Sequence, residues 1–167
     1  MKKFTFFIAV IGMIIAQSCS KDTTTPIDKD TISEVWEYNQ NINFTANNNY
    51  SLILTYPHVI YTSDMVLVYR LSGVFQGEDV WKLQPETYFF DDGTLNFEYN
   101  FDFTRSDVNV YINGYNLASL SSSNKLNQVF RVVVVPGYFG KINKINFNDY
   151  NTVIKVFHIN QSKIIKL

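Results

Sequence analysis

The sequence contains very little cysteine and histidine. Cys19 is its only cysteine, so no intramolecular disulfide can form and any folded domain must be held by its apolar core. The two histidines, His58 and His158, belong to no His-x-x-x-His or His-Glu-x-x-His pattern. We therefore expect no bound metal.

The number of glycines and the net charge are also low. The seven glycines form neither a Gly-x-Gly-x-x-Gly run nor a phosphate-binding loop, so nothing supports a nucleotide. The formal net charge is −1, with acidic and basic residues interspersed, which is unlike the basic surface that nucleic acids attract. We predict no cofactor and no nucleic-acid partner.

Only one long apolar run is present, at the N-terminus. Lys2 and Lys3 give a positive start, and residues 4–16 are apolar apart from Thr5 and Gly12. A membrane-spanning helix needs about 20 apolar residues, and this run ends too early for that. The pattern predicts a signal peptide over residues 1–18.

Cys19 follows this run directly, behind the small residue Ser18. The arrangement resembles a lipobox, where lipoprotein signal peptidase cuts before a lipidated cysteine, with residues 14–16 as the apolar lead-in. Gln17 departs from the common pattern of Leu, a small residue and then Gly or Ala. Ordinary signal peptidase would cut the same bond and leave a free thiol. We favour lipidation of Cys19, because an exposed thiol at an exported N-terminus is reactive.

The remaining chain divides into a tether and one domain. Residues 19–31 are polar, contain Pro26 and lack apolar periodicity, which predicts a lipidated cysteine followed by a flexible tether. Residues 32–167 are enough for one core, since a domain of this size buries roughly two-thirds of its unfolded surface. We expect a single domain there.

Short β-branched and aromatic runs follow from Ser33 onward, and the clearest is residues 95–104. Its alternation places Phe97, Tyr99, Phe101 and Phe103 on one buried face. The preceding Asp91-Asp92-Gly93 is a hairpin signal, so this run should pair antiparallel with residues 88–90. Further strands are expected at 35–38, 51–56, 65–71, 80–83, 107–113 and 130–135. About eight strands predict a mainly β, immunoglobulin-like antiparallel β-sandwich.

In two of these expected strands the pattern also indicates which side chains are buried. In residues 107–113 the alternation turns Val108, Val110 and Ile112 inward and Tyr111 outward, and Asn113-Gly114 then gives a second turn signal. In residues 130–135 the side chains expected on each of the two faces of the strand are apolar, apart from Arg131. This pattern predicts a strand covered on both faces.

The segment 149–158 has two interpretations. Asn148 and Asp149 are good helix N-caps, and four apolar residues follow at helical spacing, namely Tyr150, Val153, Ile154 and Phe157. The β-branched content of residues 152–157 favours a strand instead. We favour a short C-terminal helix, followed by a last edge strand at Ile164-Ile165.

The sequence offers no recognisable catalytic residues, so we expect no enzymatic activity. Asp91-Asp92 is a carboxylate pair, but adjacent acids before glycine are typical of a turn. Aromatic residues make up 16% of the chain, and most should be core. If aromatic rings form a ligand platform, Tyr111, Tyr115 and Tyr138 are the candidates.

Three segments, 80–90, 100–110 and 129–137, are together similar to small lipoproteins of flavobacterial Bacteroidetes. The resemblance covers most of the domain. It implies the location and the fold, and it carries no catalytic residues.

We therefore expect a non-catalytic binding module, monomeric and held to the membrane through lipid at Cys19, that binds a glycan or a protein partner at the cell envelope. The expected location is the outer membrane, facing the periplasm or the cell surface. A structural or assembly lipoprotein of an envelope complex is the first alternative. A hydrolase with dispersed carboxylates is the second.

Overall fold

The computed structural model describes residues 32–141 and 145–167. The predicted signal peptide, the predicted lipidation site Cys19 and the predicted tether lie outside the described residues. The strands are β1 (Glu34–Tyr38), β2 (Ser51–Thr55), β3 (Met65–Phe75), β4 (Glu78–Leu83), β5 (Glu86–Phe89), β6 (Leu95–Phe103), β7 (Asp107–Gly114), β8 (Phe130–Val135) and β9 (Ile165–Lys166). The helices are α2 (Ser122–Lys125) and α3 (Tyr150–Val156), with short 3-10 helices η2 (Ala46–Asn48), η3 (Leu117–Ser119), η4 (Gly137–Lys141) and η5 (Gln161–Lys163).

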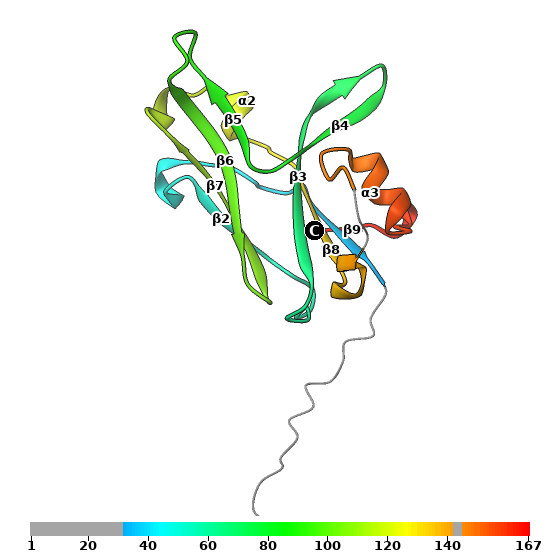
Figure 1. Ribbon diagram of the computed structural model, residues 1–167. Helices are drawn as coiled ribbons and strands as arrows, with labels where there is room; N and C mark the ends of the chain where they lie inside the picture. The colour runs from blue at the N-terminus through cyan, green and yellow to red at the C-terminus, as the bar shows by residue number, and fades with distance from the viewer. Residues whose placement is uncertain (1–31, 142–144) are drawn as a thin grey trace, which may run out of the picture.

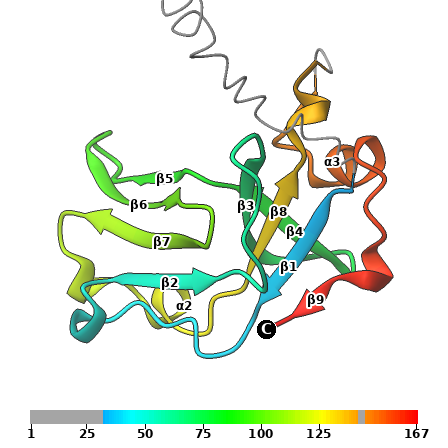
Figure 2. The ribbon, with the colours of Figure 1, turned by 90° about the horizontal axis from the view of Figure 1, so that it is seen from below.

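The strands form two sheets that face each other (Figures 1 and 2). Sheet A has the order β4-β3-β8-β1-β9, and sheet B has the order β2-β7-β6-β5. All pairs are antiparallel except β1 with β9, which run parallel. The predicted mainly β sandwich is confirmed, with β9 as the last edge strand.

Strand β8 lies in the middle of sheet A and is covered on both faces, as predicted. Val132 and Val134 belong to the core between the two sheets. Val133 and Val135 belong to a second core on the other face, beneath α3. Successive side chains of a strand point to opposite faces, so an apolar run on both parities fits a doubly covered strand.

The C-terminal segment folds as the favoured helix. The Asp149 carboxylate accepts hydrogen bonds from the backbone N–H groups of Asn151 and Thr152, and so caps the start of α3. The apolar side of α3 packs on sheet A, with Val153 and Ile154 buried.

Strand β6 shows where the alternation pattern failed. Phe97 and Tyr99 are buried as expected, whereas Phe101 is only partly buried and Phe103 is 46% exposed. The reason is that β5 pairs only with residues 95–99 of β6. Beyond that point β6 is itself the edge of sheet B, so the expectation of a buried Phe103 was wrong.

Of the two turns predicted at Gly93 and Gly114, the structure has only the first. Gly93, with φ of 83°, lies in the β5–β6 hairpin turn as predicted. Gly114 does not form a turn, because it is the last residue of β7 and pairs with Phe97. A Cβ atom on Gly114 would lie 2.6 Å from the Asn96 carbonyl oxygen, so glycine here permits a close backbone approach.

Candidate functional site

The candidate site lies along the outer edge of β1. Leu167 donates its N–H to the Glu37 carbonyl at 2.8 Å, and Asn39 donates its N–H to the Leu167 carbonyl at 3.3 Å. The backbone polar groups of Glu37 and Asn39 therefore turn away from β8. By the alternation of a β ladder, the Val35 N–H and the Ser33 carbonyl turn the same way. Because β9 pairs only with Trp36 and Glu37, these two groups lie at a level of the edge that β9 does not cover.

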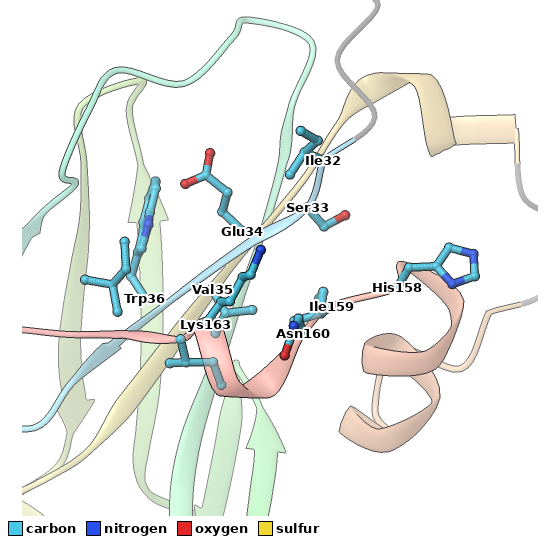
Figure 3. A pocket seen from close by; sticks show the side chains of 11 residues that line it. Ile32, Ser33, Glu34, Val35, Trp36, His158, Ile159, Asn160 and Lys163 are labelled. Atoms are coloured by element: carbon cyan, nitrogen blue, oxygen red, sulfur yellow. The ribbon is translucent and has the colours of Figure 1, made fainter.

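A hollow of about 270 Å³ opens at this level (Figure 3). Residues 32–36 form one wall, and residues 158–160 and 163–165 form the other. Ile159 gives the second wall a buried apolar residue, while His158, Asn160 and Lys163 add polar side chains. The volume is slightly below the roughly 300–1,000 Å³ of small-molecule sites, and it suits part of an extended chain.

The first wall also carries a polar atom that lacks a partner. The Ser33 hydroxyl oxygen is buried and has no hydrogen-bond partner within the described residues. A buried polar atom without a partner costs about 1–3 kcal/mol. A ligand that bonded to the Ser33 hydroxyl would remove part of that cost.

A second hollow of about 260 Å³ lies on the other side of the same segment, and it shares Ile32 and Glu34 with the first. His58 lines it, with Nε2 3.0 Å from a carboxylate oxygen of Glu34. Both histidines of the chain thus line hollows beside the start of β1. Over residues 32–141 and 145–167, no group of three His, Cys, Asp or Glu side chains is placed to hold a metal ion.

Arg70 forms a charged cluster between the sheets. Its guanidinium donates to the Glu86 carboxylate at 2.8 Å and lies 4.2 Å from the centroid of the Tyr99 ring. Burial alone would raise the pKa of Glu86, but hydrogen bonds from Lys82, Tyr88 and Arg70 outweigh it and lower that pKa. This carboxylate is fully occupied by its partners, so we interpret the cluster as structural.

A matching cluster lies on the helix-covered face of sheet A. Arg131 donates to the Glu37 carboxylate at 2.9 Å and to the Tyr150 hydroxyl at 3.0 Å. Its guanidinium also lies over the Trp81 ring. Here too every charged group has a partner, which favours a structural role over a catalytic one.

The structure does not bring the three candidate tyrosines together. Tyr111 is half-buried in β7, and Tyr115, 85% exposed, lies just beyond the end of that strand, where its N–H donates to Asn96. Tyr138 is in η4, which follows β8 at the opposite end of the sandwich (Figure 1). A single aromatic platform made of all three is therefore not present.

No pattern in the sequence predicts the hollow beside β1. Residues 33–38 have the pattern of an ordinary strand, and only the pairing with β9 shows that part of its edge is open. The second wall comes from the far end of the chain, and no local pattern links the two.

The fold and the hollow define a β-sandwich protein with a partly open sheet edge. Comparisons with family models, with curated proteins and with solved structures found no match. In the part of the chain that the structure describes, no helix is long and apolar enough to cross a membrane.

Proposed function

We propose that this protein is a lipid-anchored binding module of the bacterial envelope, which takes up an extended polypeptide segment at the edge of β1. One observation carries the proposal. The Val35 N–H and the Ser33 carbonyl point away from β8, toward a hollow that β9 leaves open.

A polypeptide fits this edge better than a glycan does. An extended peptide presents alternating N–H and C=O groups with the spacing of a strand, so it can pair with Val35 and Ser33 through its backbone. A glycan site of the kind expected from the sequence would need stacked aromatic rings, and η4, which carries Tyr138, lies at the opposite end of the sandwich from the end of β7 that Tyr115 follows (Figure 1).

The walls of the hollow set the preferred side chains. Val35 and Ile159 are buried at its base, which favours a small apolar side chain on the peptide. Lys163 on the second wall favours an acidic or polar residue next to it.

The anchor is the second part of the proposal, and it is supported by the apolar run that ends at Cys19. Labelled palmitate should enter the wild-type protein in cells and should not enter Cys19→Ala. Equal labelling of the two would contradict the anchor.

For binding, we expect a random peptide display library to enrich sequences on the wild-type protein. Ser33→Phe fills the hollow and should abolish that enrichment. Ser122→Phe, on exposed α2, makes the same change far from the hollow and should leave it intact. Bound peptide should slow hydrogen exchange at the Val35 amide. Equal enrichment on Ser33→Phe, or glycan binding with no peptide binding, would contradict the proposal.

A further inference from the structure

We propose that one end of the sandwich rests on the surface of the lipid bilayer, through a set of exposed apolar side chains that we call the rim. The rim consists of Ile32, Val59, Tyr61, Met65 and Tyr138, each between 37% and 70% exposed. This inference rests on the membrane anchoring in the proposed function.

The rim residues gather at one end of the molecule. Ile32, Val59 and Tyr61 line the same hollow. Met65, at the start of β3, pairs with Val135 at the end of β8. Tyr138 follows shortly after that strand, in η4, at the end of the sandwich where the described chain begins (Figure 1).

The loops that carry the rim are fixed in place. The Asp64 carboxylate accepts the Tyr61 N–H at 2.8 Å. The neighbouring Ile60 is buried, and its carbonyl accepts a hydrogen bond from the Arg105 side chain at 2.9 Å. Next to Tyr138, Gly137 lies so close to Ser63 that a Cβ atom would be 2.5 Å from the Ser63 carbonyl oxygen. The apolar side chains therefore point outward from a rigid base.

The position of Ile32 decides which end meets the membrane. The opposite end also exposes apolar residues, such as Phe75, Phe89 and Tyr115, so exposure alone does not choose between them. Residues 20–31 separate Ile32 from Cys19, and a chain of that length reaches at most about 45 Å. A lipid on Cys19 would thus keep Ile32 within that distance of the bilayer, and the opposite end of the sandwich has no such link.

The composition of the rim suits a bilayer surface. Tyrosine has an apolar ring and a polar hydroxyl, and it is enriched where membranes meet water. The aliphatic members, Ile32, Val59 and Met65, would add apolar area to the same contact.

The test places an environment-sensitive fluorophore at Tyr138→Cys in the mature protein, which carries its own lipid. Lipidation blocks Cys19, so the introduced thiol is the only reactive one. Tyr115→Cys is the matched control, because this exposed tyrosine lies at the far end. The proteins are reconstituted in phosphatidylcholine vesicles that contain a spin-labelled quencher lipid.

We expect a blue-shifted emission and at least twofold quenching at position 138, and neither at position 115. Tyr61→Cys should behave like Tyr138→Cys. If palmitate enters the protein but position 138 is not quenched, or if both ends are quenched equally, the rim contact is wrong and the anchor stands. If palmitate does not enter, the anchor is wrong and the rim contact fails with it.

Discussion

The guanidinium of Arg131 lies 2.8 Å from the Glu37 carboxylate and 4.0 Å from the centroid of the Trp81 ring. The other face of sheet A carries a counterpart, since Arg70 lies 2.8 Å from Glu86. The sheet thus has one buried arginine–glutamate pair on each face. Removing a single partner from such a pair leaves an uncompensated charge in a poorly solvated place, which costs more than removing both partners.

The first prediction concerns the pair on the helix-covered face. Glu37→Leu should lower the free energy of unfolding by about 3 kcal/mol, because Arg131 then loses its carboxylate. The double variant Glu37→Leu/Arg131→Met should recover most of that loss. Urea unfolding followed by tryptophan fluorescence measures both values.

Lys166→Ala is the control for this pair. Lys166 also contacts Glu37, at 3.4 Å, but its side chain is exposed, so its removal should change the stability by less than about 1 kcal/mol. A loss for Lys166→Ala as large as that for Glu37→Leu would show that burial of the Arg131–Glu37 pair does not determine its contribution.

The second prediction is loss of stability in acid. Burial alone would raise the pKa of Glu37, but its contacts with Arg131 and Lys166 lower that pKa below the ordinary value of 4.5, and the pKa of Glu86 is lowered as well. The unfolded chain therefore takes up these protons first as the pH falls. The contribution of both groups is complete above pH 4.5 and is lost as the pH drops through their lowered pKa values.

Urea unfolding between pH 7 and pH 3 measures this effect. The free energy of unfolding should decrease below about pH 4.5, and Glu86→Gln should decrease less steeply because it has one group fewer to titrate. An identical slope for Glu86→Gln and wild type would exclude Glu86 as a source of the acid sensitivity.

In this protein the sequence predicts single strands and helices well, but it does not predict which parts of a sheet edge another strand covers. Val132 to Val135 indicate a doubly covered strand from their own pattern, and Asp149 indicates a helix start, because each signal is contained in a few neighbouring residues. Phe103 could not be placed correctly, since its exposure depends on where β5 ends. Ser33 has no local signal of a site, because the hollow depends on how far β9 reaches along β1.

The third prediction tests the close approach at Gly114. A Cβ atom there would lie 2.6 Å from the Asn96 carbonyl oxygen and 2.8 Å from the Phe97 Cβ atom, so Gly114→Ala must push the β6 and β7 backbones apart. We expect a loss of about 1–3 kcal/mol in the free energy of unfolding. Gly93→Asn is the control, because its surroundings are open and asparagine tolerates positive φ. Similar losses for the two variants would contradict a steric role for Gly114.

The fourth prediction concerns β9 as a cover for the edge of β1. Both residues of β9 are exposed, and Leu167, which follows β9, adds backbone hydrogen bonds to Glu37 and Asn39. Deletion of residues 165–167 should free the whole outer edge of β1. Because an uncovered edge strand pairs readily with other chains, the truncated protein should bind selected peptides more tightly or form dimers.

Sedimentation velocity and peptide titration measure these two outcomes. Ile165→Ala is the matched control, because it shortens a side chain of β9 and keeps the backbone that pairs with β1. It should sediment and bind peptides as the wild type does. If the truncated protein also sediments like the wild type and binds peptides no better, the outer edge of β1 does not take up added strands.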